Sequence, residues 1–135
     1  MRELTLADLR GGMPALTPAS GERLAEAASH CLDEQGHEQR VVLAVAGDHT
    51  ESFVLERLAV DEVIRRTYDD QEEATEEGAC AIAILLAREL TGWSVVRRVR
   101  QKRLQTTQSD ESLGHLSAYV IVVEFSHPQA RVERR

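Results

Sequence analysis

The strongest constraint on the fold of this chain is a long helical pattern over residues 61–90. Asp61 is a favourable N-cap residue, and Thr91-Gly92 follows the last turn. Asp69-Asp70 can bend or interrupt the pattern. From residue 79 to 90 the pattern is strongly apolar, so this half of the helix must be buried around most of its circumference. We expect it to pack against a sheet and another helix.

The rest of the chain predicts one more long helix and four strands. Apolar residues at helical spacing from Leu24 to Leu32 predict a helix that opens at Ser20 or Gly21 and ends in a left-handed cap at Gly36. Valine-rich or alternating segments predict strands at 40–46, 52–58, 93–104 and 116–126. The first two strands should form a hairpin.

The predicted element order is α-β-β-α-β-β, which indicates an α+β fold with a mostly antiparallel sheet and helices packed on one face. A fully parallel sheet would need crossover helices that the pattern lacks. The 135 residues fit a single domain. We expect a short helical turn and a loop at 1–19, the core at 20–126 and a charged tail at 127–135.

Composition narrows the class of protein. Apolar residues make up 42% of the chain and charged residues 29%, as in ordinary soluble proteins. No run of about 18 apolar residues and no signal-peptide core occur, so we expect a cytoplasmic protein with no membrane contact. Cys31 and Cys80 are too far apart in sequence for a zinc knuckle, and we expect them to be buried structural residues.

The net charge of −7 hides an asymmetry. Residues 1–92 carry 8 basic and 19 acidic side chains, whereas residues 93–135 carry 8 basic and 4 acidic ones. In a single strand over 93–104, Arg98, Arg100 and Lys102 would share one face, spaced about 7 Å apart. Such a row would suit a nucleic-acid backbone, an acidic partner surface or the acidic part of a second copy.

Carboxylates lie on both sides of these basic residues. Glu72, Glu73, Glu76 and Glu77 open the apolar half of the helical pattern, and Glu124 follows four apolar strand residues, where a carboxylate resists burial. Some phosphodiester-cleaving folds assemble a metal site from a helix carboxylate and a later strand carboxylate in this order.

The same carboxylates also have a structural interpretation. Glu124 at a strand end can pair with Arg98 or Arg100 across the sheet. The helix glutamates can form a solvated face, with Arg65 and Arg66 one turn earlier.

Three segments together resemble a group of small bacterial proteins of uncharacterised function. They are 74–86 (Ala-Thr-Glu-Glu-Gly-Ala-Cys-Ala-Ile-Ala-Ile-Leu-Leu), 90–93 (Leu-Thr-Gly-Trp) and 123–126 (Val-Glu-Phe-Ser). That group resembles a trimmed PD-(D/E)XK nuclease domain, and the likeness covers roughly residues 20–126. It implies a restriction-endonuclease-like fold and a site that binds a divalent cation.

The resemblance also implies roles for particular residues. Glu76 would be the helix carboxylate and Glu124 the strand carboxylate, so these two would hold the metal. Ser126 would occupy the position of the catalytic lysine. The aspartate of the preceding strand should fall near Thr106, where no acid stands. A site that lacks one carboxylate and the lysine would bind Mg²⁺ weakly and stabilise the transition state poorly.

Two functional hypotheses follow. The first is a non-catalytic or impaired PD-(D/E)XK-like accessory protein, associated with nucleic acid through Arg98, Arg100 and Lys102. The second is a non-enzymatic α+β assembly or partner-binding module, acting as a homo-oligomer or in a complex with another protein. No cofactor is expected, and Mg²⁺ enters only if the site is active. Nucleophile-elbow, phosphate-loop and dinucleotide-binding motifs are absent from the sequence.

Overall fold

The computed structural model describes residues 2–14, 16–46, 51–91, 94–99 and 103–107. The fold class is α+β, as predicted. The described elements are, in chain order, β1 (Arg2–Thr5), the 3₁₀ helix η1 (Leu6–Gly11), α1 (Pro18–Glu34), β2 (Arg40–Val45), β3 (Glu51–Glu56), α2 (Glu62–Thr67), α3 (Gln71–Thr91), β4 (Ser94–Val99) and β5 (Arg103–Thr107).

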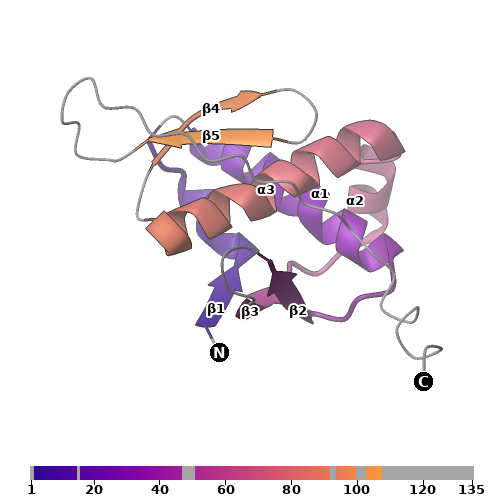
Figure 1. Cartoon of the computed structure of the whole chain (residues 1–135). Helices are drawn as coiled ribbons and strands as arrows, with labels where there is room; N and C mark the ends of the chain where they lie inside the picture. The colour runs from indigo at the N-terminus through magenta and orange to yellow at the C-terminus, as the bar shows by residue number, and fades with distance from the viewer. Residues whose placement is uncertain (1, 15, 47–50, 92–93, 100–102, 108–135) are drawn as a thin grey trace.

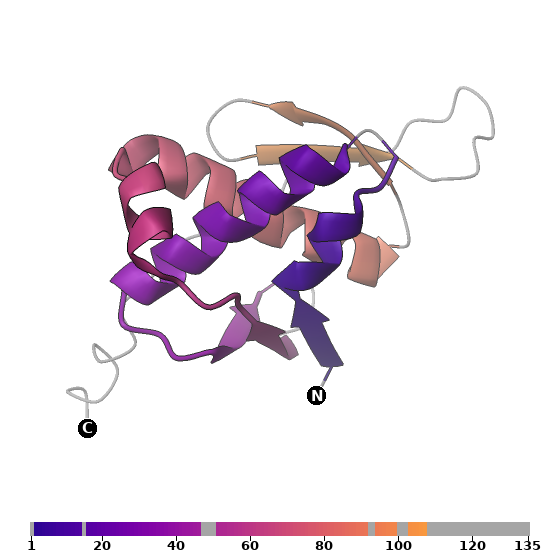
Figure 2. The same cartoon turned by 180° about the vertical axis from the view of Figure 1, so that it is seen from behind.

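The elements form three layers. The two long helices α1 and α3 pack side by side in the middle, the sheet β1-β3-β2 lies on one side of them, and the β4–β5 hairpin lies on the other (Figures 1 and 2). This arrangement explains the apolar half of α3, because residues 79–87 are all buried. The expected helix over 61–90 is interrupted at residues 68–70 and forms α2 and α3.

The three-stranded sheet is mixed rather than mostly antiparallel. β2 and β3 form the predicted antiparallel hairpin, but β1 pairs parallel to β3, with Leu4 opposite Leu55. The first described element is therefore a strand, and the predicted element order is not confirmed. Where a helical turn was expected near the start, residues 2–5 form a strand and only residues 6–11 are helical, as a 3₁₀ helix. Leu4, Leu6 and Leu9 of these two elements are buried in the main core.

Helix α1 begins earlier than the sequence indicated. Thr17, not Ser20 or Gly21, is the N-cap residue, and its hydroxyl accepts a hydrogen bond from the backbone N–H of Ser20. Pro18 then occupies the first helical position, where its missing N–H costs nothing. At the other end Gly36 has a φ of 84°, which confirms the predicted left-handed cap.

Two glycines allow elements to approach closely. A Cβ on Gly78 of α3 would lie 2.9 Å from the Cα of Ala28 in α1, and a Cβ on Gly21 of α1 would clash with the carbonyl oxygen of Leu9 in η1. Both contacts are with backbone atoms, which cannot rotate away. The helix pair therefore depends on small residues at its crossing point.

The strand predicted over 93–104 is wrong, because this stretch contains two strands. β4 and β5 pair antiparallel with Val99 opposite Arg103, so the chain reverses between them. The register shifts between Val95 and Arg97, which marks a β-bulge. The strand predicted over 116–126 lies outside the described residues, and the restriction-endonuclease-like fold stays a prediction.

Candidate functional site

The best-defined polar cluster joins the two long helices. Its members are Arg23 and Glu26 of α1, Tyr68 after α2, and Glu73 and Glu77 of α3, and it is called the Arg23 cluster below. The Arg23 guanidinium donates two hydrogen bonds to the Glu77 carboxylate, from Nε to Oε2 at 2.7 Å and from Nη2 to Oε1 at 3.0 Å. Nη2 also donates to Glu73 at 3.0 Å. Paired arginine–carboxylate hydrogen bonds of this kind are strong and directional.

Burial sets the electrostatics of this cluster. The side chain of Glu77 is only 12% exposed, whereas that of Arg23 is 46% exposed and reaches Glu77 from the rim. The hydrogen bond with Glu77 raises the pKa of Arg23 above its ordinary value. The guanidinium thus supplies the charge that keeps a largely buried carboxylate stable at the helix interface.

Tyr68 completes the cluster from the α2 side. Its hydroxyl lies 2.9 Å from Oε1 of Glu26 and 3.1 Å from the carbonyl oxygen of Arg23, and the Arg23 guanidinium stacks 5.2 Å from its ring centre. Burial, and next the hydrogen bond with Glu26, raises the pKa of Tyr68 well above its usual range. Tyr68 therefore stays neutral and acts as a hydrogen-bond donor.

Glu76, the predicted helix carboxylate of the metal site, lies apart from this cluster. Asp70 directly precedes helix α3, and its Oδ1 accepts a hydrogen bond from the backbone N–H of Glu73 at 3.1 Å. Glu76 is exposed one turn later. Within the described part of the chain its carboxylate makes no hydrogen bond or ion pair. Its predicted partners Glu124 and Ser126 lie outside the described residues.

The predicted basic row is described only in part. Arg98 lies in β4 opposite Leu104 of β5. Arg100 and Lys102 lie outside the described residues, so the proposed common face of the three cations is not observed. Thr106, at the position where the resemblance requires an aspartate, lies in β5 opposite Val95.

Two buried residues near Tyr68, His30 and Cys31, have side chains of types that often act in catalysis or metal binding. His30 is buried, its ring centre lies 6.1 Å from that of Tyr68, and its Nδ1 has no hydrogen-bond partner among the described residues. Burial raises the pKa of the Cys31 thiol to about 11, and Sγ donates to the carbonyl oxygen of Ala74 at 3.3 Å. Cys31 is thus an unreactive thiol at neutral pH, and Cys80 is likewise buried.

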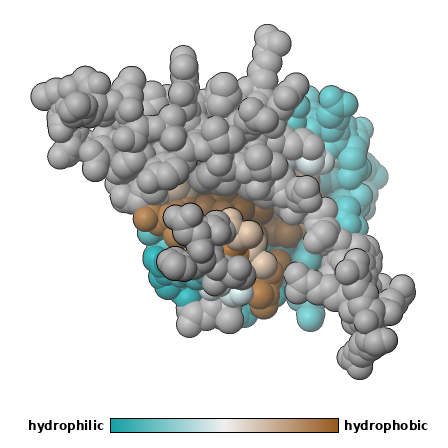
Figure 3. Space-filling model, viewed as in Figure 1, coloured by the Kyte–Doolittle hydropathy of each residue, from teal (hydrophilic) through white to brown (hydrophobic). Residues whose placement is uncertain are grey.

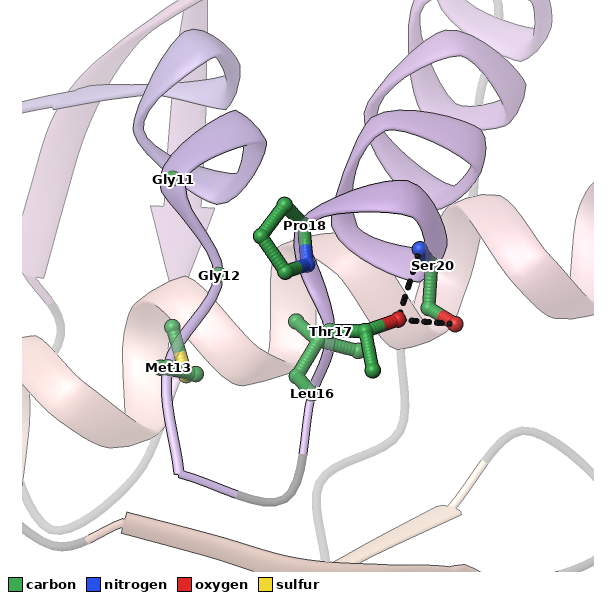
Figure 4. Close-up of a pocket in the computed structure, with 7 residues that line it drawn as sticks. All are labelled: Gly11, Gly12, Met13, Leu16, Thr17, Pro18 and Ser20. Atoms are coloured by element: carbon green, nitrogen blue, oxygen red, sulfur yellow. Dashed lines mark hydrogen bonds between the residues drawn. The ribbon is translucent and has the colours of Figure 1, made fainter.

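One open hollow lies beside the start of α1. It is lined by Gly11, Gly12, Met13, Leu16, Thr17, Pro18 and Ser20 (Figure 4). The Thr17 hydroxyl oxygen accepts from the backbone N–H of Ser20 and lies 3.1 Å from its Oγ, so these hydroxyls hold the helix start. None of the seven residues has an ionisable side chain, so the hollow offers no general acid or base.

Within the described ranges, no group of three or more histidine, cysteine, aspartate or glutamate side chains could hold a metal ion. No described helix is long and apolar enough to cross a membrane. No family model, curated protein or solved structure matches the chain.

The sequence did not reveal the Arg23 cluster. Glu73 and Glu77 are four residues apart and share a helix face, which is a visible signal. Arg23, however, precedes Glu77 by 54 residues. Only the packing of α1 on α3 joins them, so no local spacing rule could have paired them.

Proposed function

We propose that this chain is a non-enzymatic α+β module that works by binding another protein chain. The observation that carries the non-enzymatic half of the proposal is the Arg23 cluster. Glu77, the most buried of the four glutamates that open α3, is bound at both oxygens by an arginine, and Glu73 shares the same guanidinium. A carboxylate neutralised in this way is a poor ligand for Mg²⁺, because the cation would have to displace the arginine.

Charge supports a binding role. The acidic residues Asp69, Glu72 and Glu76 are exposed where α2 passes into α3, and they make no ion pair among the described residues. Basic residues Arg97, Arg98 and Arg103 belong to the β4–β5 hairpin. Acidic and basic segments in one small domain favour association with partners of complementary charge and raise its rate.

Nuclease activity is the measurement that tests the non-enzymatic half of the proposal. With Mg²⁺ or Mn²⁺ and duplex or single-stranded DNA, we expect no cleavage above buffer for the wild type or for Glu76→Ala and Glu124→Ala. Cation-dependent cleavage that is lost in both variants would contradict the proposal and would support an active PD-(D/E)XK-like site.

A second candidate function is that of an impaired PD-(D/E)XK-like accessory protein that binds nucleic acid. The basic residues of the β4–β5 hairpin favour it. A gel-shift series in increasing salt separates the two, because phosphate contacts lose affinity steeply with salt. Binding at about 50 mM salt that weakens in Arg98→Ala would support this candidate, and its absence would leave the protein-binding module.

A further inference from the structure

Strand β2 lies at one edge of the three-stranded sheet. The strand order is β1-β3-β2, so β2 pairs with β3 on one side, and no described strand pairs with its other side. An edge strand presents a row of backbone N–H and C=O groups that can pair with another strand. Natural sheets usually protect such an edge with charges, prolines, bulges or a short length.

The other edges of the described sheets carry such protection, whereas the described residues give β2 none. β1 is only four residues long and includes the charged residues Arg2 and Glu3. The β4–β5 hairpin has a bulge and several basic residues. β2 has six residues, pairs one-to-one with β3 without a bulge, and has a single charge at its start, Arg40.

Apolar side chains remain uncovered on both faces of β2. Val42, on the face away from the helices, is 60% exposed. Leu43 and Val45, on the face toward the helices, are only half-buried, although Val41 on the same face is buried. Figure 3 shows apolar surface in the region of β2 and the C-terminal half of α3, beside atoms drawn in grey. A strand added next to β2 would cover apolar area on both faces.

We propose that β2 pairs antiparallel with β2 of a second copy, so that two three-stranded sheets become one six-stranded sheet. This inference rests on the proposed binding function and names one partner and one surface. A two-fold axis gives each β2 a partner of the same length and apolar character. In an antiparallel pair the two Arg40 charges lie at opposite ends, whereas a parallel pair would place them side by side.

The size of this contact sets its strength. A six-residue strand spans about 20 Å, and pairing along it buries less than the roughly 1,200 Å² of a stable interface. The dimer should therefore be weak and should dissociate in the micromolar range. Because the pairing is apolar and uses the backbone, it should change little between low and high salt, unlike association between the acidic and basic segments.

Sedimentation equilibrium of the full chain tests the proposal, from about 5 to about 500 µM and at about 50 and 500 mM salt. Val42→Lys brings two like charges together across the two-fold axis and should weaken association at least tenfold, which is about 1.4 kcal/mol. Val63→Lys is the matched control, since Val63 is 70% exposed on α2, away from β2, and should leave association unchanged. Circular dichroism checks that both variants fold.

Hydrogen exchange of the wild-type chain gives a readout that needs no variant. Amides of residues 40–46 should exchange more slowly as protein concentration rises. Protection independent of concentration, or a wild-type mass that stays at 15.0 kDa throughout, would overturn the proposal. Association that Val42→Lys leaves unchanged, or that high salt abolishes, would also overturn the β2 pairing but would leave the protein-binding function standing.

Discussion

At the residue scale, neighbouring glutamates on one helix have different roles. Glu77 is largely buried and held by Arg23, whereas Glu76, one residue earlier in the helix, is exposed. Because the two differ by about 100° around the helix axis, sequence proximity says little about their environments. The resemblance to PD-(D/E)XK proteins selects Glu76, and the observed packing makes Glu77 the carboxylate with a defined partner.

Tyr68 gives a prediction for pH dependence. Its pKa in the folded protein is raised above the unfolded value of about 10. The neutral Tyr68 hydroxyl therefore contributes its full stabilisation below about pH 10. This stabilisation is lost as the pH rises from there through the pKa of Tyr68 in the folded protein. Urea unfolding from about pH 8 to pH 11 should show a steeper loss of unfolding free energy for the wild type than for Tyr68→Phe. Parallel pH curves for the two proteins would contradict the assigned environment of Tyr68.

At the element scale, the crossing of α1 and α3 decides the stability of the core. Gly78 lets α3 lie against the backbone of Ala28, and Ala28 is itself fully buried. The helices at this point are in van der Waals contact, so a single added methyl group has no room. This crossing also holds the Arg23 cluster together, because Arg23 and Glu77 come from the two helices concerned.

Gly78→Ala should therefore destabilise the protein, although alanine favours a helix by about 1 kcal/mol. The added Cβ would force the helices apart, and we expect a net loss of about 1–3 kcal/mol in the unfolding free energy from urea titration. Gly11→Ala is the matched control, since a Cβ there meets nothing within 4 Å, and it should change stability by less than about 0.5 kcal/mol. Equal effects of the two substitutions would show that the helix crossing tolerates the methyl group.

Local patterns in the sequence predicted those features of the fold that are set by residues close together in the chain. The buried stripe of α1, the β2–β3 hairpin and the break between α2 and α3 all follow from spacing, capping and turn residues. The β4–β5 reversal was missed because residues 100–102 contain no glycine or proline to signal a turn. The parallel pairing of β1 with β3 was missed because it joins segments about fifty residues apart.

At the scale of the whole molecule, the order of layers explains the composition of the chain. A central helix covered by a sheet on one side and a hairpin on the other must be apolar around its circumference, as residues 79–87 are. The polar beginning of α3 extends beyond this covering, and there its glutamates meet Arg23. The same helix thus combines a buried core segment with a charged contact to α1.

The central claim is that the buried carboxylate of α3 holds two helices together rather than a metal ion. A double-mutant cycle on Arg23→Met and Glu77→Gln, followed by urea unfolding, tests it most directly. We predict a coupling free energy of about 1 kcal/mol, because each single change removes the same paired contact. A coupling indistinguishable from zero, together with Mg²⁺ stabilising the wild type but not Glu77→Gln, would contradict the claim and would make Glu77 a metal ligand.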